Sequence, residues 1–241
     1  MDAATYLDAI RTNADVLVDA AEKSGLDARV PPCPEWNVGD LLGHIGRVHR
    51  WAAGNATRKP TDDFWPGNEI EIPEPEARPT WVRQGVGELV AALDRAPDSP
   101  AWTWIPPATV GFWQRRQAHE TAMHRVDAEA AAGTAHPIDG ELAADGIDEW
   151  LGLVGKTRRG APPAGTGETM HFHCTDVTGE WLVHLTPDGI DVRREHAKGD
   201  VAARGTASDL LCWLQGRGPM DRLEVFGDEA LLARWREVAT F

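Results

Sequence analysis

Apolar residues recur at every third or fourth position through most of the first 155 residues, which is the spacing of amphipathic helices. Prolines between positions 31 and 34 exclude a helix there, and Asn37 then supplies a favourable N-cap for the next helix. Two proline-rich stretches, 58–79 and 96–110, predict loops. The pattern therefore predicts five helices, at residues 4–24, 38–53, 81–94, 111–132 and 141–154.

In the last third of the chain, apolar and polar residues alternate as they do in strands. Met170, Phe172 and Cys174 point to one face of the first such strand, whereas His171 and His173 share the other. Two imidazoles on one face can bind a metal ion together, but the sequence offers no evident third ligand. A polar sheet face is the favoured interpretation of this histidine pair.

The change of periodicity predicts two domains. Residues 156–169, rich in glycine, threonine and proline, are typical of a linker. We therefore expect an α+β protein with a helical domain at 1–155 and a small α/β domain at 166–241. Later elements of the second domain are expected as strands at 190–194, 199–204 and 223–226 and as helices at 207–215 and 228–239.

Composition limits the range of partners. The chain has 241 residues and a net charge of −14 at pH 7, and its lysines and arginines form no basic block. Nucleic acids and anionic membranes attract clustered positive charge, so neither is an expected partner. No apolar run reaches the roughly 20 residues of a transmembrane helix, and the acidic N-terminal stretch does not resemble a secretory signal.

The three cysteines are odd in number and far apart in the sequence, which argues against a disulfide framework. With the absence of a signal or membrane segment, this predicts a soluble, cytoplasmic protein. Frequent alanine, glycine, arginine and tryptophan with little lysine indicate a GC-rich bacterial genome. The sequence leaves open whether the protein is a monomer or a homodimer.

A metal site is the strongest chemical hypothesis. Glu120 and His124 lie four residues apart on a predicted helix, so their side chains share one face. His44, on a different predicted helix, lies among apolar residues and can complete a three-ligand site between helices. Three protein ligands leave one coordination position open, as in catalytic zinc sites. Two simpler interpretations remain: His44 as an ordinary core residue, and Glu120 with His124 as a solvated ion pair.

Other histidines near these positions are not expected to be ligands. The segment from His119 to His124 resembles a zinc-protease motif, but that motif requires histidines four residues apart. Here the spacing is five, which turns the two side chains about 140° apart around the helix. His49 is likewise rotated away from His44, so structural roles are favoured for His49 and His119.

Three short segments follow one another along the chain: Cys33-Pro34-Glu35-Trp36, Asp40-Leu41-Leu42-Gly43-His44, and Glu120 with His124-Arg125-Val126-Asp127. In this order they resemble the motifs of the mycothiol-dependent maleylpyruvate isomerase family, a branch of the DinB-like metal-binding helical bundles. The C-terminal segment GRGPMDRLEVFGDEALLARW resembles the α/β domain of the same family, which is sterol-carrier-like. The resemblance thus extends over nearly the whole chain.

This resemblance implies a DinB-like four-helix bundle followed by a sterol-carrier-like α/β domain, with His44, Glu120 and His124 as metal ligands. Zinc is the expected ion, because two imidazoles and a carboxylate suit it. The resemblance also implies that a small thiol, mycothiol, acts as cosubstrate on a small electrophile. The thiol would add reversibly to the double bond of maleylpyruvate in an isomerase, or stay on the product in an S-transferase.

The related isomerases use an arginine of the C-terminal domain near the metal, and Arg217 and Arg222 are the catalytic candidates here. An arginine can bind a substrate carboxylate through two hydrogen bonds. A surface or interdomain salt bridge is the alternative for both. Two other functions stay open: a non-catalytic metal-containing binding module, and a metal hydrolase that needs no thiol.

Further residues near the predicted ligands have two interpretations each. Asp127 can orient the imidazole of a ligand, or be an ordinary helix acid. Asp40 has the same alternatives, although acids are common in the first turn of a helix because of the helix dipole. Cys33 can be a nucleophile, but a free cysteine is more often a small apolar residue. Trp36 and Trp51 are expected to pack within the bundle.

Overall fold

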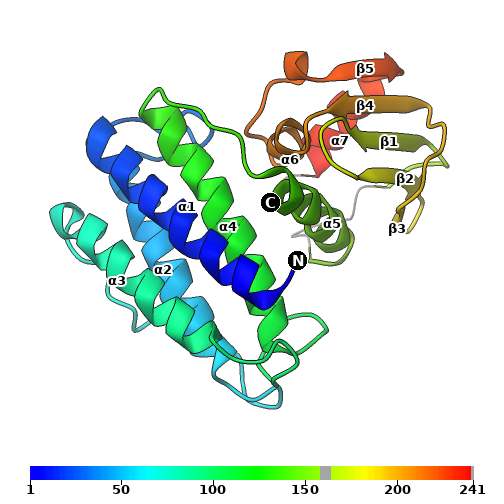
Figure 1. Ribbon diagram of the computed structural model, residues 1–241. Coiled ribbons are helices and arrows are strands. Elements are labelled where there is room, and N and C mark those ends of the chain that lie inside the picture. Colours follow the sequence, from blue (N-terminus) through cyan, green and yellow to red (C-terminus); the bar gives the residue numbers. More distant parts are fainter. Residues whose placement is uncertain (158–163, 240–241) are drawn as a thin grey trace. The chain divides into compact units, whose positions relative to one another are not determined.

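The structure is a computed structural model that describes residues 1–157 and 164–239. The chain divides into two compact units, Met1–His136 and Pro137–Phe241, and each is considered by itself. The predicted α+β class is confirmed, because the first unit is helical and the second combines helices with a five-stranded sheet (Figure 1).

Four helices lie side by side in the first unit (Figure 1). The helix α1 packs against α3 and α4, and α2 packs against the same two helices. The helices α1, α2 and α3 each bury an apolar face, and Ile10, Leu17, Leu41 and Leu89 are fully buried in the core. The helix α4 is buried on most sides, polar residues included. The predicted bundle is therefore present, with a short 3-10 turn before its third helix. Its helices are α1 (Ala3–Ser24), α2 (Val38–Ala56), α3 (Arg78–Leu93) and α4 (Val110–Ala131), and the turn is η1 (Pro75–Ala77).

The helix α2 begins as the sequence predicted but ends three residues later. Asn37 accepts a hydrogen bond from the backbone N–H of Asp40, whose carboxylate accepts one from Asn37 N, so both groups cap the helix. The stop expected at Gly54 was wrong because this glycine serves close packing. A side chain there would overlap the ring of Trp65, so the small residue lets the helix approach the 58–79 loop.

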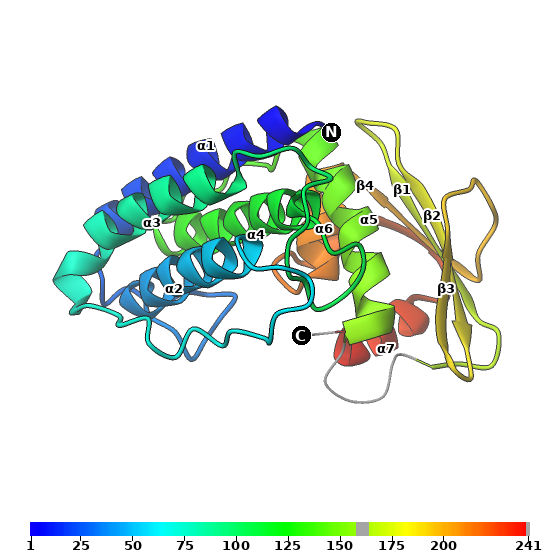
Figure 2. The same cartoon turned by 90° about the horizontal axis from the view of Figure 1, so that it is seen from below.

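In its described residues the second unit contains five strands and three helices, and the sheet order is β3-β2-β1-β4-β5. The strands β1 and β4 pair in parallel, and the other neighbours in this order pair antiparallel. The three helices lie over one face of the sheet (Figure 2), where Phe172 packs near Trp213 of α6. Because side chains alternate along β1, His171 and His173 point from the opposite face, as expected. The strands are β1 (Thr169–Cys174), β2 (Glu180–Thr186), β3 (Gly189–Arg193), β4 (Val201–Gly205) and β5 (Glu224–Gly227); the helices are α5 (Gly140–Thr157), α6 (Ala207–Leu214) and α7 (Glu229–Val238), with a 3-10 turn η2 (Met220–Arg222).

The boundary between the units differs from the one expected at residue 155. The helix α5 belongs to the second unit, because its buried face packs against α6 and β3. Trp181 of β2 also donates a hydrogen bond from Nε1 to Asp148 Oδ1, at 2.6 Å. Part of the expected linker, residues 158–163, lies outside the described residues, and β1 already begins at Thr169.

Two buried charged residues of α4 bind the last residue of the first unit, His136. Arg125 pairs with Glu129 one helical turn later, at 2.5 Å, and donates a hydrogen bond to the backbone oxygen of His136. Glu129 also accepts from the His136 ring. Both Arg125 and Glu129 are almost fully buried, so this contact fixes where the chain leaves α4. None of the helices in the described part of the chain is long and apolar enough to cross a membrane.

Candidate metal centre

The structure brings His44, Glu120 and His124 together, although they come from two helices. His44 lies on α2 at the edge of the buried face formed by Leu41 and Ile45, so its ring reaches α4 while staying partly exposed. Glu120 and His124 lie one turn apart on α4 and point to the same side. One ligand atom from each residue lies within 4.8 Å of the other two.

The distances within this triad fit one small cation. Glu120 Oε1 lies 3.5 Å from His44 Nε2 and 3.2 Å from His124 Nε2. In a tetrahedral zinc site with bonds of about 2.0–2.2 Å, neighbouring ligand atoms are about 3.3–3.5 Å apart. Two imidazole nitrogens and a carboxylate oxygen are also a donor set that zinc accepts readily. The residues present therefore fit the ion that the sequence predicted.

Two further residues of α4 hold these ligands in place. Asp127 is fully buried, and its Oδ2 accepts a hydrogen bond from Nδ1 of His124 at 2.8 Å. This bond holds a proton on Nδ1, so Nε2, which otherwise donates to Glu120, is the nitrogen that can give up its proton and bind an ion. Arg116 Nη2 lies 3.2 Å from Glu120 Oε2, whereas both histidines lie near the other carboxylate oxygen, Oε1. The sequence suggested the Asp127 contact as one of two alternatives, but Arg116 was missed despite its helical spacing of four from Glu120.

The three residues of the triad are strongly coupled electrostatically. Burial would lower the pKa of His124, but hydrogen bonds and charge from Asp127 and Glu120 outweigh burial and raise it to about 9. Burial would raise the pKa of Glu120, but hydrogen bonds from His124 and His44, with the charge of Arg116, hold it well below its usual value. Glu120 is thus ionised at neutral pH and available to a cation.

Trp36 covers part of the triad. Its ring centroid lies 4.8 Å from that of His44 and 6.1 Å from that of His124, so the ring lies against two members of the triad. The loop before α2 places this residue, because Trp36 N donates to the Cys33 carbonyl and Val30 N to the Trp36 carbonyl. For Cys33 these bonds show a role of its backbone in shaping the loop. Its thiol remains half-buried.

Comparison with known proteins follows the same division of the chain. The family model of the mycothiol maleylpyruvate isomerase N-terminal domain matches residues 7–129, and that of the corresponding C-terminal domain matches residues 141–234. The chain belongs to the mycothiol maleylpyruvate isomerase family. The first match contains all three residues of the triad.

Solved structures support the family's fold. Two crystal structures of the mycothiol-dependent maleylpyruvate isomerase, one of them a histidine-to-alanine mutant, superpose with TM-scores of 0.66 and 0.67. Each match covers 93% of this chain and 93% of the other, at 13% and 12% sequence identity respectively. At such low identity the likeness establishes a shared fold. No curated protein sequence matches the chain.

Other histidines and acids near the triad have structural roles in this family member. Asp40 caps α2 rather than orienting His44. His49 is fully buried, and its Nε2 lies 3.0 Å from Thr121 Oγ1, whose own proton goes to the Gln117 carbonyl. His49 Nε2–H is therefore the donor, and burial lowers the pKa of this imidazole to about 3. The ring of His119 is turned to the edge of Tyr6.

The two candidate arginines of the mycothiol maleylpyruvate isomerase C-terminal domain lie around η2. Arg217, which follows α6, donates from Nη1 to the Gln215 carbonyl at 2.8 Å. Arg222 lies at the end of η2 with a side chain 58% exposed, 3.6 Å from Asp209 Oδ1. These contacts place both guanidinium groups in the second unit, and their catalytic role remains a prediction.

Proposed function

We propose that this protein is a zinc-dependent enzyme that uses a low-molecular-weight thiol, mycothiol, as the nucleophile towards a small electrophile. The observation that carries the proposal is the convergence of two imidazoles and a carboxylate, with Asp127 orienting one imidazole from behind. Membership of the mycothiol maleylpyruvate isomerase family supports the choice of thiol. The reaction is either cis–trans isomerisation of maleylpyruvate or transfer of the thiol to the electrophile.

The residues of the chain divide the work between them. His44, Glu120 and His124 would hold the ion, and when bound it supplies positive charge that favours the thiolate form of a thiol. Asp127 keeps the proton of His124 on Nδ1, so that Nε2 remains a ligand. Trp36 shields one side of the two imidazoles from water. The partial exposure of His44 and Glu120, at 35% and 25% of their side chains, leaves the triad open to a small molecule.

For the isomerase, the electron balance needs no further reactant. A C–S bond forms as the thiolate adds to the double bond, and the π electrons move onto the conjugated carbonyl group. The former double bond rotates, then re-forms as the C–S bond breaks and the thiolate leaves. In an S-transferase the carbon next to the carbonyl group takes up a proton instead, and the C–S bond stays. Arg217 or Arg222 is the candidate to bind a carboxylate of the electrophile through paired hydrogen bonds.

Calorimetric titration of mycothiol into zinc-loaded protein tests the proposal. Two buffers of different ionisation enthalpy report the proton that a thiol releases when it binds as thiolate. We expect saturable binding with proton release, which His124→Ala abolishes. The matched control is His119→Gln on the same helix, because His119 faces Tyr6 and should leave thiol binding unchanged.

Two results would reject the proposal. Zinc-loaded wild-type protein that does not bind mycothiol would exclude a thiol mechanism. Ester cleavage by the zinc-loaded protein without any thiol would instead favour a hydrolase. If thiol binding is found, mass spectrometry of the product after reaction with maleylpyruvate separates the two reactions, because only transfer leaves sulfur on the product.

A further inference from the structure

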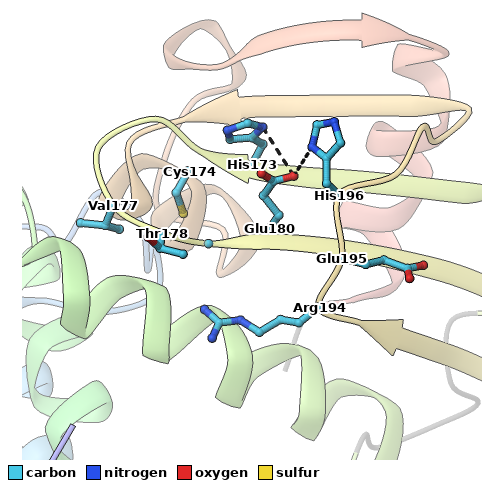
Figure 3. Close-up of a pocket in the computed structure, with 9 residues that line it drawn as sticks. His173, Cys174, Val177, Thr178, Glu180, Arg194, Glu195 and His196 are labelled. Carbon is cyan, nitrogen blue, oxygen red and sulfur yellow. Dashed lines mark hydrogen bonds and ion pairs between the residues drawn. The ribbon is translucent and has the colours of Figure 1, made fainter.

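A second group of imidazoles surrounds one carboxylate in the second unit. Glu180 begins β2 and is the direct partner of His173 on β1, with His171 two residues earlier on the same strand face. Glu180 Oε2 lies 3.3 Å from His171 Nε2, 3.9 Å from His173 Nδ1 and 2.5 Å from His196 Nδ1. Figure 3 shows His173 and His196 converging on Glu180 from different segments of the chain.

The loop that carries His196 is held at both ends. Before it, the Arg194 guanidinium lies over the Trp181 ring at 5.3 Å and 3.4 Å from Asp148. After it, the Asp200 carboxylate accepts hydrogen bonds from the backbone N–H and hydroxyl of Thr169 at 2.7 and 2.8 Å. Between these two ends, His196 reaches the sheet face from which His171 projects, and the centroids of the two rings lie 5.7 Å apart. A ligand on this loop therefore loses less conformational entropy on binding than one on a free loop.

His171 is the buried member of the group. Its side chain is only 6% exposed, and Nε2 makes no hydrogen bond to any residue in 1–157 or 164–239, although the Glu180 oxygen is 3.3 Å away. A buried nitrogen without a hydrogen bond is costly, and a cation between Nε2 and the carboxylate would satisfy both groups.

We infer that His171, Glu180 and His196 form a second metal site, for a divalent late first-row cation such as zinc. One ligand atom from each lies within 4.8 Å of the other two, and the imidazole-rich donor set suits this class of ion. The 3.3 Å between His171 Nε2 and Glu180 Oε2 is the spacing of adjacent ligands around zinc, about 3.3–3.5 Å. His196 Nδ1, now 2.5 Å from the same oxygen, would have to draw back to make room for the ion, and its exposed side chain allows this. All three residues belong to the second unit, so this inference can be tested independently of the proposed thiol chemistry.

The surroundings give an ion a way in. His173, Glu180 and His196 line a pocket of about 390 Å³ (Figure 3), and the His196 side chain is 80% exposed. An ion can therefore reach the site without unfolding of the sheet. Because β1, β2 and the 194–200 loop each supply a ligand, binding would tie that loop to the sheet. His173 lies next to the three ligands as a further imidazole.

Zinc stoichiometry on the full-length protein tests this inference. The protein is stripped with a chelator, reloaded and desalted, and bound zinc per chain is measured by elemental mass spectrometry. We expect two equivalents in the wild type and one in His196→Ala, whose exposed side chain makes misfolding an unsuitable explanation for the loss. Glu180→Gln should weaken the second equivalent by more than about tenfold. Mycothiol binding should persist in His196→Ala.

The matched control is His184→Ala, because His184 lies on the same face of β2 as Glu180 but outside the three-residue set. It should keep two equivalents. One equivalent in the wild type that His196→Ala leaves unchanged would overturn the inference. So would two equivalents in both proteins. His124→Ala gives a further check. This variant should keep one equivalent of zinc, and the double variant His124→Ala/His196→Ala should bind none.

Discussion

Replacing Asp127 by asparagine is the sharpest test of the proposed metal site at His44, Glu120 and His124. Asp127 is fully buried, and its contact with His124 Nδ1 is 2.8 Å long. Asparagine keeps the size and an acceptor oxygen, so packing in α4 should survive. The change removes a negative charge that stabilises the Nδ1–H of His124. That charge also makes Nε2 a stronger metal ligand, because it raises the electron density of the ring.

The expected magnitude follows from two opposing effects. Loss of a carboxylate behind a metal-bound histidine weakens metal affinity about 10–100-fold, or about 1.4–2.7 kcal/mol. The same carboxylate helps to raise the pKa of metal-free His124 to about 9, so protons compete with the metal at neutral pH. Asp127→Asn lowers that pKa and relieves the competition. Near neutral pH the net loss of zinc affinity should therefore be at the lower end of this range, about tenfold. The loss should grow as the pH approaches 9.

Zinc affinity is measured by competition with a chelating dye at several pH values, and the His124 pKa by NMR titration of the metal-free protein. Asp40→Asn is the matched control, because Asp40 lies four residues before His44 yet caps α2. It should leave zinc affinity unchanged. Equal affinities in wild type and Asp127→Asn at every pH, with a His124 pKa still near 9, would refute this account of the centre.

Three other predictions concern stability. Because burial lowers the pKa of His49 to about 3, unfolding takes up a proton below pH 6.5, and the free energy of unfolding should fall with decreasing pH by up to about 1.4 kcal/mol per unit. His49→Gln should flatten this slope in urea unfolding. Gly46→Ala should destabilise α2 because a methyl group would overlap the Trp81 ring, whereas Gly87→Ala on α3 meets no atom and should stabilise by about 1 kcal/mol. Chelation should lower the melting temperature of the wild type, and by less in His124→Ala, where the retained equivalent in the second unit still contributes.

Local patterns predicted those features that depend on neighbours in sequence. The apolar spacing located α1, α2 and α3 because each of these helices buries one face, and the alternation at 170–174 located β1 for the same reason. The helix α4 is buried on most sides, polar residues included. The pairing of Glu120 with His124 followed from helix geometry. The sequence placed α5 in the first domain, but this helix belongs to the second unit. Amphipathicity shows that a helix has a buried face but not which surface covers it.

The group around Glu180 could not be predicted because its members are brought together by the sheet register and by a loop. His171 and His173 were evident as a pair, but Glu180 reaches them only because β1 pairs antiparallel with β2 in one register. A shift of one residue would turn Glu180 to the opposite face. His196 lies outside every strand, so no periodicity marks it.

The two aspartates near the first centre show what a spacing rule lacks. Each lies about one turn from a histidine of the triad, but Asp127 contacts its histidine whereas Asp40 caps a helix. Asp40 is in the first turn of α2, where backbone N–H groups have no helical partner, and its carboxylate accepts from one of them at Asn37. Asp127 is inside α4, where the backbone donors are already used by the helix, so its buried carboxylate needs a side-chain donor. Position within the helix thus decides which acid orients a histidine of the triad.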